Sequence, residues 1–210
     1  MTADRYSAIQ AVAGAVSRET FEDIERFEAA FRKWSARINL AAPSTLPYLW
    51  QRHILDSAQL VGLAPEARQW LDLGSGGGFP GAIIAILMKE RNGAHVDLVE
   101  SSHKKAAFLK TTLASLQAPA AVYSRRIEDC YAEIRPPEVI TARALASLST
   151  LLRLIEPWMQ SGARALLHKG RDYRREVEES GDVWRFDLLE HRDKVGGDGV
   201  ILEISNLRRL

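Results

Sequence analysis

The amino-acid sequence predicts an α/β fold, in which a doubly wound, mostly parallel sheet carries an N-terminal helical extension and a C-terminal antiparallel hairpin. Three observations predict it. Apolar residues recur at helical spacing in the first third of the chain, short apolar strands alternate with helices from residue 69 onward, and two final strands flank a glycine-rich turn. We expect residues 1–66 to form the extension, packed on the core, and residues 67–210 to form the main domain.

The composition of the 210 residues excludes several classes of protein. Hydrophobic residues make up 46% and charged residues 26%, which allows a buried core and excludes global disorder. Lys and Arg number 28 against 27 Asp and Glu, so any nucleic-acid site must be a local patch. The single cysteine, Cys130, excludes an internal disulfide and a multi-thiolate zinc site, and we expect it to be a buried structural thiol. Because neither a secretory signal nor a long apolar stretch is evident, we expect a cytoplasmic monomer that binds no metal and no membrane.

The N-terminal extension is predicted to be helical. Residues 8–16 are apolar and small, and a stripe of large apolar residues then recurs at spacings of three and four, which predicts a helix of about five turns with one buried face. The stripe comprises Phe21, Ile24, Phe27, Phe31, Trp34 and Ile38. Pro43 and Pro47 interrupt the pattern, and a second helix is predicted over residues 48–61, ended by Gly62.

Strands and helices alternate in the main domain, which indicates a parallel sheet. The expected strands cover residues 70–73, 95–100, 120–123, 138–141 and 163–168, and the expected helices cover 82–89, 104–116, 148–159 and 171–179. Two further strands, at 183–189 and 200–207, flank the turn at 196–199 and are predicted to pair as an antiparallel hairpin.

A glycine-rich turn at 74–81 follows the first strand of the main domain. Glycines let the backbone approach a ligand closely, and the helix that follows offers free N–H groups. A dinucleotide site requires a glycine where this chain has Phe79. Gly74, Gly76 and Gly78 instead fit the Gly-x-Gly-x-Gly pattern of Rossmann-like methyltransferases that use S-adenosylmethionine (SAM).

Two acidic residues flank this turn. Asp72 lies in the strand before it, and Glu100 ends the next strand, where a carboxylate can accept hydrogen bonds from both ribose hydroxyls of a nucleoside. The alternative for Glu100 is a surface acid at a strand end. With the glycines, the two acids favour a nucleoside-type cofactor, and SAM in particular.

All the charged residues within residues 101–127 are basic: this segment contains no Asp or Glu, although the chain as a whole is nearly neutral. We call these residues the basic run. The run comprises Lys104, Lys105, Lys110, Arg125 and Arg126. Phosphate binding and a solvated face are both consistent with it. Lys169 ends a strand on the side where such sheets bind ligands, and we expect it to contact RNA; a surface or helix-capping lysine is the alternative.

His53, Asp56 and Ser57 lie within one turn of the second helix. A metal site would need further ligands, and a catalytic triad drawn from a single turn is disfavoured. Two interpretations remain equally open: a hydrogen-bonded link between the extension and the glycine-rich turn, or contact with the substrate. His53 is a candidate RNA contact on the second interpretation.

Several motifs appear in an order that is specific as a set. They are Trp34…Asn39-Leu40, Arg52-His53-Ile54-Leu55-Asp56-Ser57, Asp72 to Gly81, Lys104-Lys105…Phe108-Leu109, Thr141-Ala142-Arg143-Ala144 and Lys169-Gly170. Over about residues 20–170 the chain resembles the RsmG (GidB) family of bacterial small-subunit ribosomal RNA methyltransferases. The combination of His-x-x-Asp-Ser with Gly-Phe-Pro-Gly is the most specific part of the resemblance.

The resemblance implies SAM-dependent transfer of a methyl group to N7 of a guanine, conventionally nucleotide 527, in the 530 loop of 16S rRNA. It implies that Gly74 and Phe79 contact SAM, that Ile127 and Glu128 flank its adenine, and that Arg143 lies beside the cofactor and the incoming base as the catalytic residue. Guanine N7 carries a lone pair and no proton, so its methylation requires positioning and not a general base.

Three rival functions remain to be weighed. A SAM enzyme acting on a small molecule would need no basic run. A nonenzymatic RNA-binding or ribosome-assembly protein with this fold would bind RNA independently of SAM. A nucleotide-dependent oxidoreductase is disfavoured by Phe79 in place of glycine.

Overall fold

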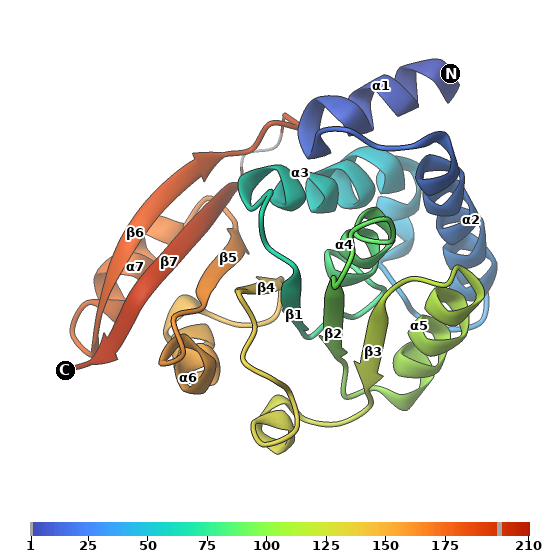
Figure 1. Ribbon diagram of the computed structural model, residues 1–210. Helices are drawn as coiled ribbons and strands as arrows, with labels where there is room; N and C mark the ends of the chain where they lie inside the picture. Colours follow the sequence, from blue (N-terminus) through green and yellow to red (C-terminus); the bar gives the residue numbers. More distant parts are fainter. Residues whose placement is uncertain (1, 197–198) are drawn as a thin grey trace.

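The computed structural model describes residues 2–196 and 199–210 and confirms the α/β class, with one sheet of seven strands (Figure 1). The strands are β1 (Gln69–Leu73), β2 (His95–Val99), β3 (Ala120–Tyr123), β4 (Val139–Arg143), β5 (Arg164–Lys169), β6 (Trp184–Arg192) and β7 (Val200–Arg209). Their order is β3-β2-β1-β4-β5-β7-β6, and the first five are parallel. The predicted C-terminal hairpin is present: β7 pairs antiparallel with both β5 and β6, which leaves β6 at the edge. Part of its predicted turn, at residues 197 and 198, lies outside the described residues.

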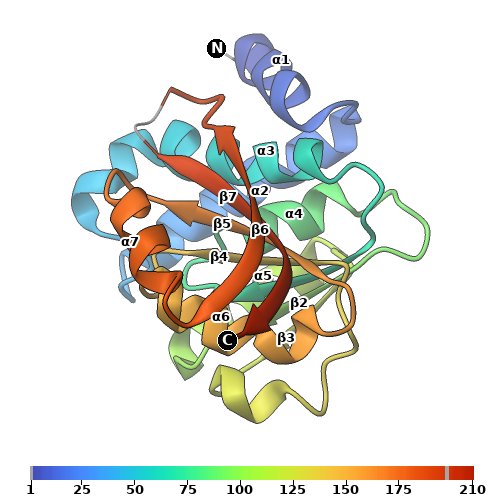
Figure 2. The same ribbon diagram turned by 90° about the vertical axis from the view of Figure 1, so that its left-hand side faces the viewer.

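Helices cover both faces of the sheet (Figures 1 and 2). The helices are α1 (Thr2–Ala13), α2 (Arg18–Ser35), α3 (Asp56–Leu63), α4 (Gly81–Leu87), α5 (His103–Ser115), α6 (Leu148–Met159) and α7 (Tyr173–Ser180). The first five pack on one face, and α6 and α7 pack on the other. Among the described residues, no helix is both long enough and apolar enough to cross a membrane.

Alternation along the strands divides the interior into two hydrophobic cores, one on each face. In β1, Trp70 belongs to the core beneath the first five helices, whereas Leu71 and Leu73 belong to the core beneath α6. All three side chains are at most 1% exposed. This is why apolar residues face both sides of the strand: a parallel strand covered on both faces buries side chains in both directions, and Asp72 is the one buried charged residue of β1.

The apolar stripe of the extension faces the core, as predicted. Phe21, Ile24, Phe27 and Phe31 are between 0% and 4% exposed, and the Ser17 hydroxyl caps the start of α2 by accepting a hydrogen bond from the Thr20 amide. The helix ends at Ser35, three residues before the end of the stripe. Ile38 still packs against the core, from the turn that follows.

The predicted helix over residues 48–61 consists of two helices of different geometry, preceded by a third, and it ends at Leu63, one residue beyond the predicted end at Gly62. A 3-10 helix (Pro43–Tyr48) leads into a π-helix (Trp50–Leu55), and α3 follows directly. The sequence pattern did not distinguish these geometries. A π-turn is wider than an α-turn and is frequent at functional sites, and here it presents the backbone oxygen of Arg52 to the Arg143 side chain.

The strand register brings the carboxyl ends of the central strands together. Leu73 pairs with Val99 on one side and with Ala142 on the other, and Arg143 pairs with His168. In open α/β sheets, ligands bind at this edge. The register therefore places the glycine-rich turn, Arg143 and His168 along one edge.

Candidate functional site

Two neighbouring cavities open at the carboxyl edge of the sheet. The smaller, of about 150 Å³, lies beside the glycine-rich turn, and its lining includes Gly74, Ser101, Ile127 and Glu128. The larger, of about 660 Å³, lies over the ends of β4 and β5 and beneath the extension. Ala146 lines both cavities. A ligand in one cavity can therefore approach a ligand in the other.

The glycine-rich turn folds back over the end of β2. The amides of Gly74 and Ser75 both donate to the Val99 carbonyl, at 2.9 and 3.0 Å. Gly76 has a φ of +55°, and a Cβ built on it would have no neighbour closer than the Gly74 oxygen at 3.7 Å. The room at Gly76 fits a backbone that leaves space for a ligand.

The second half of the turn faces the core. A Cβ on Gly78 would lie 2.9 Å from Phe27 Cζ and 2.8 Å from Ala82 Cβ. Phe79 is 8% exposed, and its ring centroid lies 5.8 Å from that of Phe27 and 5.2 Å from that of Phe31. Gly78 and Phe79, expected to contact the cofactor, therefore seat the turn on α2 and line neither cavity in this structure.

Asp72 is also turned inward, with no exposed surface. Its Oδ1 accepts a hydrogen bond from the Thr141 hydroxyl at 2.8 Å, and its Oδ2 accepts one from the Gly81 amide at 3.1 Å. Burial raises the pKa of this carboxyl to about 6, although these hydrogen bonds act in the opposite direction. Asp72 thus joins β1, β4 and the start of α4, and does not reach the cavity.

Glu100 braces the turn from the neighbouring strand. Its Oε2 accepts from the Gly76 amide at 2.8 Å, and its Oε1 accepts from the Ser102 amide at 2.7 Å. Its two neighbours in the chain, Val99 and Ser101, line the smaller cavity. Each carboxylate oxygen has a second lone pair, so these bonds leave capacity for further donors.

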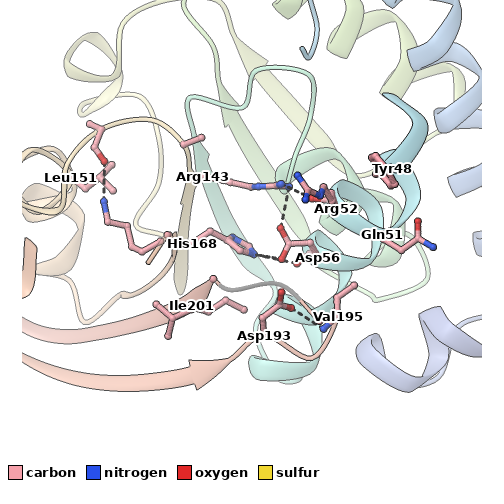
Figure 3. Close-up of a pocket in the computed structure, with 17 residues that line it drawn as sticks. Tyr48, Gln51, Arg52, Asp56, Arg143, Leu151, His168, Asp193, Val195 and Ile201 are labelled. Atoms are coloured by element: carbon pink, nitrogen blue, oxygen red, sulfur yellow. Dashed lines mark hydrogen bonds and ion pairs between the residues drawn. The ribbon is translucent and has the colours of Figure 1, made fainter. Parts of the chain in front are cut away.

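Three charged or titratable side chains meet at the floor of the larger cavity (Figure 3). Asp56, at the start of α3, lies between Arg143 at the end of β4 and His168 in β5. Its Oδ2 is 3.2 Å from Arg143 Nη1, and its Oδ1 is 3.2 Å from His168 Nε2. The side chains are between 11% and 19% exposed. We call this group the Asp56 cluster.

A second layer of contacts holds Asp56 in place. Gln59 Nε2 donates to Asp56 Oδ1 and to Asp193 Oδ1, both at 2.9 Å, and its Oε1 accepts from the Lys194 amide at 3.0 Å. Arg143 Nη2 donates to the Arg52 carbonyl. The extension, β4, β5 and the segment after β6 are therefore joined through polar contacts at one site.

Electrostatics within the cluster follow from burial and charge pairing. Burial acts to raise the pKa of Asp56, but hydrogen bonding to His168 and the charges of His168 and Arg143 outweigh it, and the pKa is lowered. Burial lowers the pKa of Arg143, opposed chiefly by the charge of Asp56. Asp56 is thus an ionised carboxylate whose charge faces an Arg guanidinium.

His53 lies outside both cavities. Its ring centroid is 5.0 Å from that of Phe79, and burial, with the charge of Arg143, lowers its pKa from 6.5 to about 4. Ser57 donates to the His53 backbone carbonyl at 2.6 Å and not to the imidazole. This geometry favours the interpretation of His53 as a link between the extension and the glycine-rich turn, and argues against a direct RNA contact.

The predicted RNA contacts fall into two groups, one accessible to solvent and one buried. Lys104, Arg125 and Arg126 are exposed and Lys105 is half-buried, and the two arginines line the smaller cavity. Lys169 is different: its side chain is 7% exposed, and its Nζ lies 2.6 Å from Glu176 Oε2 and 3.1 Å from the Ala146 carbonyl. Lys169 therefore joins the end of β5 to α7, and in this structure its ammonium is not presented to a phosphate.

Sequence reasoning missed two parts of the larger cavity. His168 was not singled out, although its register opposite Arg143 places it in the Asp56 cluster. Tyr48, at the start of a predicted helix, is 57% exposed at the cavity rim, with the Arg52 guanidinium 5.7 Å from its ring centroid. The only signal in the sequence is the spacing of four residues between this aromatic residue and an arginine, and the sequence does not show that the ring is exposed.

The expectation for the single cysteine is tested by the structure. Cys130 is a buried thiol, as predicted: it has no exposed surface, and burial raises its pKa. Within residues 2–196 and 199–210, no group of three or more His, Cys, Asp or Glu side chains is arranged to hold a metal ion.

Two of the solved structures with a similar fold are named as methyltransferases. The O-methyltransferase TomG from Streptomyces achromogenes, determined in complex with SAM, aligns with a TM-score of 0.55 over 93% of each chain at 13% identity. A ribosomal protein L11 methylase from Lactobacillus delbrueckii aligns with a TM-score of 0.54 over 72% of this chain and 76% of that one, at 18% identity. At these identities the likeness shows the fold alone.

Sequence comparison is more specific. A protein named ribosomal RNA small subunit methyltransferase G from Chelativorans sp. is 73% identical over the full length of both chains. One of the same name from Brucella canis is 57% identical over all of this chain and 99% of that one. The family model described as "GidB: rRNA small subunit methyltransferase G" matches residues 20–198. By this family match and these full-length relatives, the chain belongs to the rRNA small subunit methyltransferase G family.

Proposed function

We propose that this protein transfers a methyl group from SAM to N7 of a guanine in 16S rRNA, at conventional position 527 in the 530 loop. The observation that carries the proposal is the pair of cavities that share Ala146 at the carboxyl edge of the sheet. One offers glycine backbone and two acidic residues nearby, as a nucleoside requires. The other is larger and ends in a buried arginine. The monomeric state, the cytoplasmic location and the domain boundary at residue 66 belong to the same proposal.

The residues of the smaller cavity fit SAM. The Ile127–Glu128 segment, which lines the cavity, would hold the adenine. Gly76 and Glu100 do not line it but adjoin its lining residues, and the open space at Gly76 and the carboxylate of Glu100 would hold the amino-acid end and the ribose, respectively. Asp72, Gly78 and Phe79 would act through the shape of the turn. When bound, SAM supplies a methyl group on a sulfonium: the S–CH3 bond breaks as the N7–CH3 bond forms, and the positive charge passes from sulfur to guanine.

The larger cavity would receive the guanine. N7 needs no proton removed, so the chain's contribution is to orient the base and to exclude water. Arg143 Nη1 is buried, and within the described residues it makes an ion pair with Asp56 but no well-aligned hydrogen bond. An unfilled buried donor beside a cavity suits an acceptor on the substrate, such as guanine O6.

The rRNA would enter over basic and aromatic side chains that are exposed or, for Lys105, half-buried. Lys104, Lys105, Arg125 and Arg126 lie beside the smaller cavity or along the adjoining α5, and Tyr48 and Arg52 lie at the rim of the larger one. Unpaired RNA bases stack on aromatic rings and arginine planes. We propose Tyr48 as such a stacking surface.

The decisive experiment is transfer of a labelled methyl group from SAM to small ribosomal subunits that lack this modification, with mass-spectrometric mapping of the product. Label at N7 of the 530-loop guanine is the expected result. Label at another nucleotide would keep the enzyme class and overturn the proposed position. No label, with SAM binding shown separately, would favour a small-molecule or nonenzymatic function.

Arg143→Ala provides the first check on the assignment of Arg143. We expect turnover to fall by about a hundredfold, because the variant loses a donor placed beside the reacting base. The unfolding temperature should change much less. Full activity in a folded Arg143→Ala variant would remove Arg143 from the catalytic site.

A further inference from the structure

We propose that Asp56, supplied by the N-terminal extension, is a positioning residue that fixes the Arg143 guanidinium and offsets its charge while the guanine becomes cationic. The inference rests on the proposed function and adds a residue to it. Three observations carry it: the ion pair between the two side chains, the layer of contacts that immobilises Asp56, and the direction in which charge moves during N7 methylation.

The first observation is geometric. Asp56 Oδ2 lies 3.2 Å from Arg143 Nη1, and both side chains are more than four-fifths buried. The Arg143 backbone belongs to β4, whereas Asp56 begins α3, so the contact joins the sheet to the extension. Arg143 Nη2 is held in turn by the Arg52 carbonyl, which also belongs to the extension. The orientation of the guanidinium is therefore determined by residues outside the main domain.

The second observation is that Asp56 has little freedom to move. Gln59 donates to it at 2.9 Å, and His168 Nε2 lies 3.2 Å from the same oxygen. The other contacts of Gln59, to Asp193 and to the Lys194 amide, fix Gln59 itself. A carboxylate already held by two side chains loses little additional entropy when it holds Arg143.

The third observation is chemical. Guanine is neutral before transfer and carries a positive charge on its imidazole ring afterwards. A lone buried guanidinium beside that ring would oppose the developing charge, because charges interact strongly where water is excluded. With Asp56 paired to it, Arg143 can donate a hydrogen bond while the pair as a whole adds no net charge. The pair suits this reaction better than an isolated arginine would.

The test begins with Asp56→Asn, which keeps the shape and removes the charge. The matched control is Asp23→Asn, because Asp23 is another buried carboxylate of the extension and is paired with Lys89 at 2.8 Å, away from both cavities. We expect Asp56→Asn to lower kcat on small subunits by at least about tenfold, with little change in the Kd for SAM. Asp23→Asn should lower stability and leave kcat unchanged.

A double substitution separates positioning from simple stability. If Asp56 acts through Arg143, the effects of Asp56→Asn and Arg143→Gln are not additive, and the double variant has a kcat no lower than that of Arg143→Gln alone. If Asp56 serves only to hold the fold together, the two losses multiply. Multiplied losses would overturn the proposal.

A binding measurement provides a readout that does not depend on turnover. With S-adenosylhomocysteine present, the Kd of each variant is measured for small subunits with and without the N7 methyl group. Asp56→Asn should weaken binding of the methylated, cationic form by at least about tenfold relative to the unmethylated form. An unchanged ratio would contradict the charge-offset role. Failure of the wild-type protein to methylate subunits would instead contradict the proposed function.

Discussion

The two sides of the site are built by different means. The glycine-rich side is a continuous segment, residues 72–81, with one brace from Glu100. The Asp56 side is assembled from the extension, β4, β5 and the segment after β6, which are far apart in the chain. The first is recognisable as a local sequence motif, although its second half packs on α2, whereas the second is formed only by residues that are distant in the chain.

The largest effect on SAM binding and methyl transfer is expected from a substitution in the first half of the glycine-rich turn. Gly76→Arg should abolish measurable SAM binding and methyl transfer, since its side chain would occupy the open space of the turn, while the unfolding temperature shifts by less than about 5 °C. Calorimetric titration with SAM and thermal unfolding measure the two quantities.

Gly78→Ala is the comparison within the same turn. Its Cβ would meet Phe27 and Ala82 at under 3.0 Å, at a φ of +99°. We expect the free energy of unfolding to fall by about 2–4 kcal/mol, measured by urea denaturation. If Gly76→Arg proves the less stable of the two variants, the division of the turn into a cofactor half and a packing half is wrong.

The next largest effect is expected on the KM for small subunits, from a substitution at the rim of the larger cavity. Tyr48→Ala should raise KM for small subunits by about tenfold, since one stacked base contributes on the order of 1–3 kcal/mol, while kcat and SAM affinity stay near wild type. Tyr48→Phe keeps the ring and should keep the wild-type KM. Leu189→Ala, at another exposed apolar residue on the edge strand β6, is the control. Equal KM values for all three variants would remove Tyr48 from the RNA path.

The basic run on the glycine-rich side gives a smaller effect that depends on salt. The affinity of the protein for RNA should fall steeply as salt rises, and Lys104→Ala with Lys105→Ala should reduce the log–log slope by about 1.4, since each phosphate contact on a single strand contributes ~0.7. Filter binding over a series of salt concentrations measures the slope. A wild-type slope in the double variant would assign these lysines to a solvated face.

The smallest expected effect is on the pH dependence of stability. His53 has a pKa of about 4 in the folded protein against 6.5 in the unfolded chain. Between these values the unfolded chain binds the extra proton, so the contribution of His53 is complete above pH 6.5 and is lost as the pH falls toward 4. Asp72, with its pKa raised from 3.8 to about 6, has the opposite sign: its contribution declines as pH rises through that range.

Urea unfolding at several pH values between 4 and 6.5 tests both groups. His53→Gln should reduce the gain in stability with rising pH, and Asp72→Asn should increase that gain, although each variant also changes the overall stability. Parallel stability curves for wild type and either variant would show that the corresponding side chain does not titrate as its burial requires.

Sequence reasoning succeeded where the information is local. The alternation of strands and helices, the glycine-rich turn and the inward-facing stripe of α2 follow from patterns within about 20 residues, and the structure has each of them. It was less successful on the direction in which a side chain points. Phe79 and Gly78 belong to the right motif, yet they face α2 because Phe27 and Phe31 supply an aromatic surface there.

The site features that the sequence did not predict depend on contacts between residues far apart in the chain. Lys169 follows a strand end as expected, but Glu176 lies within reach on α7 and binds its ammonium. His168 joins the Asp56 cluster because β4 and β5 pair with Arg143 opposite His168, a register that no local pattern specifies. The sequence left two interpretations of residues 53–57 equally open, a link to the glycine-rich turn and contact with the substrate. In the structure His53 packs against Phe79 of the turn, whereas Asp56 faces the larger cavity.

Because Gly78 and Phe79 pack against α2, the shape of the glycine-rich turn depends on a helix that lines neither cavity. A shortened side chain at Phe27 would leave a void beneath the turn, and a screen for cofactor affinity would score it as a binding defect. Among relatives of this protein, changes at 27 and 31 should therefore be accompanied by compensating changes at 78 and 79. A catalogue of loss-of-function variants that counts only ligand-contacting residues would miss this group.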